Sequence, residues 1–334
     1  MTEAERKREA ALGAARGRLV TSRPADVRWL LCGRGRPVEN GGADYTVVLE
    51  NDDARVLFAD IEQPRVEEEE RLDELGYTLE PYPWFEGHGL RETLPVLDEL
   101  RRALCQEELA RYRQAGSDAA AAVVATLPEL KPELREIDAA GVLVRRLVEL
   151  GFTVPVVLVA GERRQAVHRH PLPTEEQLGR NALLAVTAER AGLHVSLTRI
   201  VSFGRPPGEL SRLTQAAAQV DAAMLAASRP GATTGSVLDA AAEEYEAQGF
   251  PNEWRRHHQG GITGYRGREV FAVPGEPTQL PGVCAVAWNP SITGGAKSED
   301  TALVAADGVE VITRTPELGE LETQGLPRPS IFQL

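Results

Sequence analysis

Three histidines and one glutamate are the groups in this chain best suited to move a proton. His170 opens a loop with the sequence His-Pro-Leu-Pro-Thr, whereas the adjacent pair His257 and His258 precedes a glycine-rich turn. An imidazole titrates near neutral pH, so His170 is a candidate general acid and base, with His168 a weaker one. Glu299 could orient such an imidazole and raise its pKa. If His170 stood alone, an ordinary surface loop beside Arg169 and His168 would be the better explanation of it.

A second group of polar side chains is suited to hold a small ligand. Arg268 could bind a carboxylate through two hydrogen bonds, and the neutral Asn289 can both donate and accept. The glycines after the histidine pair would let the backbone approach a ligand closely. We therefore predict a substrate site formed by His257, His258, Tyr265, Arg268, Glu269 and Asn289. The alternative is a structural hairpin in which Arg268 and Glu269 pair with the rest of the fold.

These segments, together with Ser196-Leu-Thr-Arg199 and Lys297-Ser-Glu299-Asp300-Thr301, resemble the family of creatinase, Xaa-Pro aminopeptidases and methionine aminopeptidases. The resemblance implies a pita-bread fold and a cleft in which most members hold two divalent cations through two Asp, one His and two Glu. The matching positions here are Ala185 or Thr187, Ser196, His257, Asn289 and Glu299. Only two of these five positions keep a ligand.

Two hard dications need several carboxylate oxygens, so we expect no metal and no cofactor at this site. A single zinc ion held by His257, His258 and Glu299 is the alternative. Creatinase is a member that works without metal, and the resemblance implies that His170 matches the histidine that shuttles its proton.

The overall charge disfavours some classes of partner. The 334 residues include 50 acidic and 37 basic ones, a net charge of −13, whereas nucleic acids and anionic membranes require a basic surface. The widely spaced Cys32, Cys105 and Cys284 are typical of reduced thiols. The charged N-terminal segment lacks an apolar signal core, so we expect a cytoplasmic protein.

The order of helical and extended patterns predicts two domains. In residues 1–105 we expect helices at 3–17, 67–75 and 90–104, and strands at 27–32, 46–49 and 56–58. In residues 106–334 we expect helices at 108–127 and 210–228, each followed by a second helix that ends near Gly151 or Gly249. Ser236 and Asp239 suggest a capping box at the start of the last of these helices.

Strand-like runs follow each helix pair, at 154–159, 183–186 and 195–204 in one half and at 270–273 and 283–288 in the other. This internal echo predicts a pseudo-twofold domain with helices packed on a curved, mostly antiparallel sheet. Chance similarity between alanine-rich helices is the alternative.

The sequence therefore predicts an α/β (α+β) protein with a creatinase-type N-terminal domain at 1–105 and a pita-bread domain at 106–334. We expect a homodimeric, metal-independent hydrolase or lyase that acts on a C–N bond of a small amino-acid-like or peptide substrate. The alternatives are an inactive pita-bread binding protein and a metal-dependent Xaa-Pro aminopeptidase.

Overall fold

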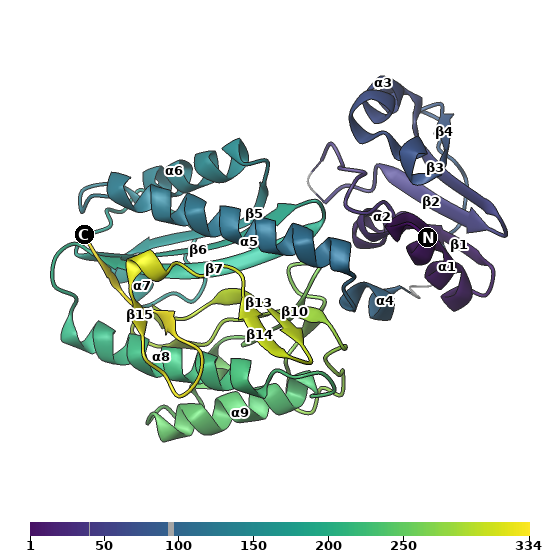
Figure 1. Cartoon of the computed structure of the whole chain (residues 1–334). Helices are drawn as coiled ribbons and strands as arrows, with labels where there is room; N and C mark the ends of the chain where they lie inside the picture. Colours follow the sequence, from purple (N-terminus) through teal and green to yellow (C-terminus); the bar gives the residue numbers. More distant parts are fainter. Residues whose placement is uncertain (40, 93–96) are drawn as a thin grey trace.

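The computed structural model describes residues 1–39, 41–92 and 97–334. Its N-terminal part contains helices α1 (Glu3–Ala14), α2 (Pro24–Leu30), α3 (Gln63–Arg65) and α4 (Asp98–Arg102), and strands β1 (Arg18–Thr21), β2 (Tyr45–Glu50), β3 (Asp53–Ala59) and β4 (Thr78–Tyr82). The strands form a sheet in the order β1-β2-β3-β4, in which only the β3–β4 pairing is parallel among the described strands. Figure 1 shows this part, in purple to blue, beside the larger remainder of the chain.

Several expectations for the N-terminal part are wrong. Residues 27–30 of the apolar run at 27–32 belong to helix α2, which begins at Pro24 and ends at Leu30. Every described residue from 25 to 30 is buried, and a short run buried on all sides has no periodicity that separates helix from strand. The expected helix at 67–75 is instead a π-helical turn, η2 (Val66–Glu70), and a 3-10 turn, η3 (Leu72–Leu75). Of the expected helix at 90–104, residues 93–96 lie outside the described part and α4 covers only 98–102.

The C-terminal part follows the expected order of elements closely. Its helices are α5 (Gln106–Thr126), α6 (Glu136–Glu149), α7 (Glu162–Gln165), α8 (Gly208–Ala227) and α9 (Thr234–Ala247). Its main strands are β5 (Thr153–Gly161), β6 (Asn181–Arg190), β7 (Leu193–Ser202), β8 (Gly260–Thr263), β9 (Val270–Phe271), β10 (Cys284–Trp288), β13 (Asp300–Ala305) and β14 (Gly308–Val311). The helix α9 begins earlier than expected, because Thr233, and not Ser236, caps it by accepting a hydrogen bond from the Ser236 N–H.

Two helix-and-sheet halves form this part of the molecule. One sheet has the order β17-β7-β6-β5, where β17 is Phe332–Gln333, and the other has the order β14-β13-β10-β8-β9. Helices α5 and α6 lie against the first sheet and α8 and α9 against the second (Figure 1). A bridge between Thr198 and Glu299 joins the two sheets. The expected pseudo-twofold arrangement is thus confirmed, and it brings both halves to a common centre.

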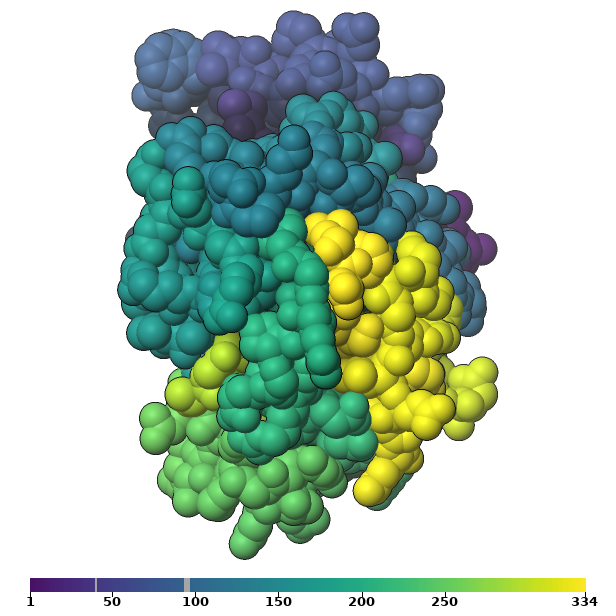
Figure 2. Space-filling model, turned by 90° about the vertical axis from the view of Figure 1, so that its left-hand side faces the viewer, coloured from purple at the N-terminus to yellow at the C-terminus, as the bar shows by residue number. Residues whose placement is uncertain are grey.

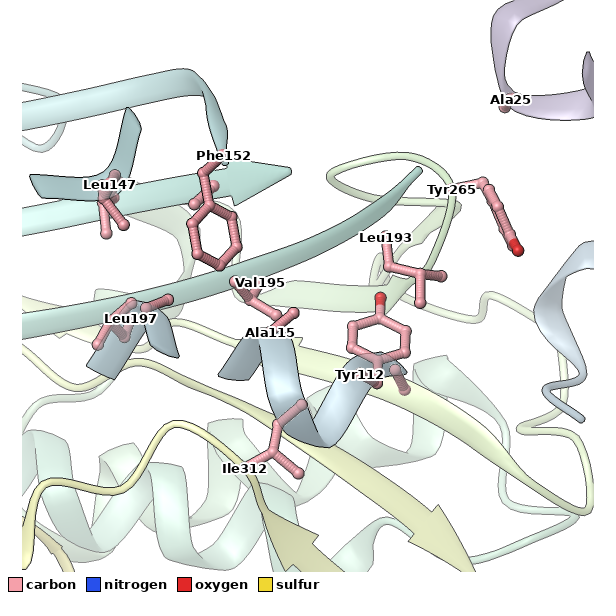
Figure 3. Packing of buried hydrophobic residues seen from close by; sticks show 14 of the residues in the cluster. Ala25, Tyr112, Ala115, Leu147, Phe152, Leu193, Val195, Leu197, Tyr265 and Ile312 are labelled. Carbon is pink, nitrogen blue, oxygen red and sulfur yellow. The ribbon is translucent and has the colours of Figure 1, made fainter. Parts of the chain in front are cut away.

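Close packing between helix and sheet fixes the frame of this centre. Tyr112 and Ala115 of α5 contact the β7 residues Leu193, Val195 and Leu197, all of them buried (Figure 3). Each fully buried aliphatic side chain of this kind contributes about 1.5–3 kcal/mol relative to exposure. Helix α5 therefore holds strand β7 in place on the face that it covers.

The C-terminal segment closes one side of the domain. Residues after Leu318 (yellow) run over the surface between the teal and green parts of the chain (Figure 2), and β17 pairs in parallel with β7. The short strands β11 (Ser291–Ile292) with β12 (Ala296–Lys297), and β15 (Glu320–Leu321) with β16 (Arg328–Pro329), form small hairpins. Within the described ranges, no helix has the length and apolar character needed to cross a membrane.

Candidate active site

A cavity of about 430 Å³ opens where the two halves meet. Apolar side chains form one wall, and the lining residues are Pro155, Val156, Leu158, His170, Ala185, Val186, Thr187, His194, His258, Gly267, Arg268, Phe271, Asn289, Lys297 and Glu299. His170 therefore shares one cavity with Asn289 and Glu299, both more than a hundred positions further along the chain, and His258 and Arg268 line the same cavity. A volume of this size suits a small molecule.

The floor of the cavity carries a carboxylate that is shared by two cations. Glu299 Oε2 lies 3.0 Å from Lys297 Nζ, and its Oε1 lies 3.1 Å from a terminal nitrogen of Arg268. The hydroxyl of Thr198 donates to Oε2 at 2.7 Å. Burial alone would raise the pKa of Glu299, but Lys297 and Arg268 lower it below its usual value. Glu299 is therefore ionised at neutral pH, and among the described residues its side chain contacts two cations and a hydroxyl, not a histidine.

Lys297 is a site residue that the sequence reasoning missed. It stands two positions before Glu299, and side chains at i and i+2 of an extended segment point to the same face. Both are less than 10 % exposed, and both line the cavity. The two-residue spacing of Lys297 and Glu299 could therefore have identified Lys297 as a site residue.

Three histidines form a second cluster beside the floor. The Nε2 atoms of His170 and His257 are 2.9 Å apart, within hydrogen-bond distance. The His257 and His258 rings stack with centroids 4.4 Å apart, and those of His170 and His258 are separated by 5.4 Å. His257 is half-buried, whereas His170 and His258 are exposed at the mouth of the cavity. The structure thus brings both members of the histidine pair close to His170.

The surroundings keep these imidazoles neutral. Burial, followed by the positive charge of Lys297, lowers the pKa of His257 to about 2. Burial and the nearby Arg268 lower the pKa of His258 to about 4. Desolvation of the ring and Lys297 also lower the pKa of His170. At neutral pH the rings are therefore uncharged, and in the contact between His170 and His257 one Nε2 donates to the other.

The loop that carries His170 is anchored on both sides. The Thr174 hydroxyl donates to Glu136 at 2.7 Å, which ties the loop to helix α6. Arg169 pairs with Glu253 and donates to the Ser291 hydroxyl at 3.0 Å. These contacts connect the loop to the segment just before His257, and they explain why residues so distant in sequence lie together.

The positions that match lost metal ligands are occupied by neutral groups. The hydroxyls of Thr187 and Ser196, which are directly paired on β6 and β7, lie 2.9 Å apart. A terminal nitrogen of Arg268 lies 3.4 Å from the Ser196 hydroxyl. Asn289 is 2 % exposed, and its Oδ1 has no hydrogen-bond partner among the described residues. The side chain of Asn289 lines the cavity, although its Oδ1 atom itself is buried.

Two residues predicted to bind substrate lie elsewhere. Tyr265 donates to Glu108 at 2.7 Å and lies 3.3 Å from Lys7 Nζ of helix α1. Glu269 pairs with the buried Arg101 at 2.8 Å. Both side chains therefore connect the C-terminal part to the N-terminal part, outside the residues that line the cavity.

The paired glycines at 260 and 261 also serve the fold. A Cβ atom on Gly260 would lie 2.1 Å from the carbonyl oxygen of Ala287, and one on Gly261 would lie 1.8 Å from that of Val270. The close approach that they permit is between neighbouring strands.

The residues at the floor do not fit a pair of divalent cations. Of the described residues that line the cavity, Glu299 alone carries a carboxylate, and two cations already neutralise it. At an effective dielectric constant of about 20, a dication about 4 Å from one ammonium group is repelled by roughly 8 kcal/mol. The site lacks the oxygen anions that would offset this cost.

Known structures share the architecture of the whole chain. The dipeptidase PepE from Mycobacterium ulcerans has a TM-score of 0.76 at 16 % identity over 99 % of this chain and 98 % of its own. The prolidase from Pyrococcus horikoshii has a TM-score of 0.76 at 14 % identity, with 97 % and 100 % covered. The X-Pro aminopeptidase from Thermotoga maritima has a TM-score of 0.74 at 14 % identity, with 98 % and 100 % covered.

At these sequence identities the likeness establishes the fold alone. It is the predicted pita-bread fold, preceded along the chain by a smaller N-terminal domain. No curated protein matches the chain by sequence. Residues 110–306, more than half of the chain, match the model of metallopeptidase family M24, and the chain therefore belongs to that family.

Proposed function

We propose that this member of a hydrolase family cleaves a C–N bond of a small amino-acid-like or peptide substrate without a metal ion. The observation that carries the proposal is the shared carboxylate at the cavity floor. Lys297 and Arg268 lie against Glu299, the last of the family's metal-ligand positions, and they supply fixed positive charge there. Such charge stabilises the oxyanion that forms when water adds to a carbonyl carbon.

His170 moves the proton in this reaction. Its neutral imidazole accepts a proton from the attacking water as the new C–O bond forms, and then donates it to the leaving nitrogen as the C–N bond breaks. The hydrogen bond to His257 Nε2 orients the ring and selects its tautomer. In this assignment Glu299 holds the two cations in place, so the orienting role expected for it passes to His257.

Substrate binding uses the remaining groups of the cavity. The cluster of Lys297, Arg268 and Glu299 has a net positive charge, which favours a carboxylate. The side-chain amide of Asn289, which lines the cavity, forms a hydrogen bond with the substrate, and the apolar wall near Val156 and Leu158 takes a hydrocarbon portion. We further propose a cytoplasmic homodimer, and the domain boundary at 105/106 stays a prediction.

A binding protein without catalysis is the second candidate. It is favoured by the engagement of both Glu299 oxygens, which leaves the cavity with imidazoles alone as bases among its described lining. In that case His170 would have no chemical role.

Replacing His170 separates these candidates. The wild type, His170→Ala and the loop control His168→Ala, all treated with EDTA, would be assayed on amides, guanidino acids and Xaa-Pro dipeptides. We expect turnover to fall about 10²–10⁴-fold in His170→Ala only, while its free energy of unfolding changes by less than about 0.5 kcal/mol. Ligands that bind wild type and His170→Ala equally well without turnover would support the binding protein. Activity lost in EDTA and restored by Mn²⁺ would overturn the metal-independent mechanism.

A further inference from the structure

The three imidazoles at the mouth of the cavity form a group distinct from the carboxylate floor. One ligand nitrogen from each of His170, His257 and His258 lies within 4.8 Å of the other two. We propose that these histidines bind a single divalent transition-metal ion, of the class represented by Zn²⁺. The proposal concerns binding alone and does not depend on the proposed hydrolase activity.

The distances suit a tetrahedral ion after small side-chain movements. Zinc–nitrogen bonds of about 2.0–2.1 Å place the ligand nitrogens of a tetrahedral site about 3.3 Å apart. The Nε2 atoms of His170 and His257 are already 2.9 Å apart. His170 and His258 are exposed, so their rings can turn without disturbing the core. The fourth position would face the cavity and take water or a ligand.

The donor set selects the kind of ion. Imidazole nitrogen suits zinc, copper and nickel, whereas magnesium and calcium require oxygen ligands. A hard cation would find only nitrogen donors in this cluster.

The charges around the cluster limit its affinity. Arg268 and Lys297 are near, and Glu299 balances one of their two charges. Arg169 beside His170 is paired with Glu253. The ion would therefore meet a modest positive potential, and we expect reversible binding that EDTA removes. If the proposed hydrolase also holds, bound zinc occupies His170 and inhibits turnover.

Equilibrium dialysis of the full-length chain against Zn²⁺, without a histidine tag, tests the proposal. We expect one equivalent of zinc per chain, and affinity at least about tenfold lower in each of His170→Ala, His257→Ala and His258→Ala. His168→Ala, an exposed histidine of the same loop that lies outside the cluster, should bind as the wild type does. Cobalt in place of zinc should give intense visible absorption, as expected for a tetrahedral site.

Glu299→Gln distinguishes this site from the metal positions of the family. It should still take up one equivalent at saturating zinc, because Glu299 is not a ligand of the histidine cluster. No binding by the wild type, undiminished binding by His257→Ala, or uptake abolished in Glu299→Gln would each overturn the proposal. Circular dichroism of each variant verifies that it is folded, and inhibition of turnover is a separate measurement.

Discussion

Glu299 and Asp300 are adjacent in sequence, but their carboxylates belong to two ionic clusters that differ in net charge and in contact with the cavity. Asp300 accepts from Arg199 at 2.8 Å and from Arg328 at 2.6 Å, and Arg328 also donates to Asp221 at 2.8 Å. All four groups are at most 3 % exposed, and two negative charges balance two positive ones. This cluster is closed and neutral.

The cluster around Glu299 is open and unbalanced. Lys297 and Arg268 share one carboxylate, and the group borders the cavity. Successive residues of a strand point to opposite faces, so a single step along the chain separates the two environments. The comparison indicates that the closed cluster serves stability, whereas the open one retains positive charge for a ligand.

Breaking the closed cluster should have the largest effect on stability. Arg328→Ala leaves Asp221 and Asp300 buried with unbalanced charge, a change that typically costs about 3–5 kcal/mol. Urea denaturation measures this loss. The control Arg314→Ala removes a half-exposed partner of Glu320, and we expect a loss of at most about 1 kcal/mol. Equal losses in the two variants would contradict the structural role of the closed cluster.

The sequence predicted the pita-bread domain well because its helices are long and because glycines mark where two of them end. Gly151 and Gly249 both adopt the left-handed conformation expected after a helix, with φ of 79° and 85°. In the N-terminal part the expected helix at 3–17 and the strands at 46–49 and 56–58 are present as α1, β2 and β3, whereas the other three expected elements are not found as predicted. The apolar run at 27–32 fits a strand or a helix equally well, and only its contacts decide.

The sequence predicted which residues line the site better than it predicted which residues form ion pairs with one another. His170, His258, Arg268, Asn289 and Glu299 do share the cavity, and His257 contacts His170. The sequence does not reveal that Glu269 pairs with Arg101, a residue 168 positions away, while the adjacent Arg268 reaches the cavity. Such long-range ion pairs depend on the docking of two domains, which leaves no local pattern.

Neutralising the carboxylate of the open cluster should cost less than breaking the closed cluster. Glu299→Gln leaves Lys297 and Arg268 without a counter-charge, but water in the cavity can solvate them. We expect a loss of about 1–3 kcal/mol in the free energy of unfolding, measured with urea at pH 7. Glu310→Gln, at a half-exposed pair with Arg113, is the control and should change little. A loss as large as that of Arg328→Ala would mean that water does not solvate Lys297 and Arg268 at the cavity floor.

The pH dependence of that loss is the smallest and most specific effect. Burial alone would raise the pKa of Glu299, but Lys297, Arg268 and the Thr198 hydroxyl lower it in the folded state. A carboxyl with a folded pKa below its unfolded value of about 4.3 stabilises the protein above that pH, and this contribution is lost as the pH falls towards the folded pKa. The difference between wild type and Glu299→Gln should therefore stay constant from about pH 7 to 5 and narrow below about pH 4.3. Comparing two proteins cancels the titration of the carboxyls that they share, so the narrowing reports Glu299 itself. A difference that widens on acidification would mean that burial outweighs the two cations, and Glu299 would then not be the ionised group that holds Lys297 and Arg268 in place in the proposed mechanism.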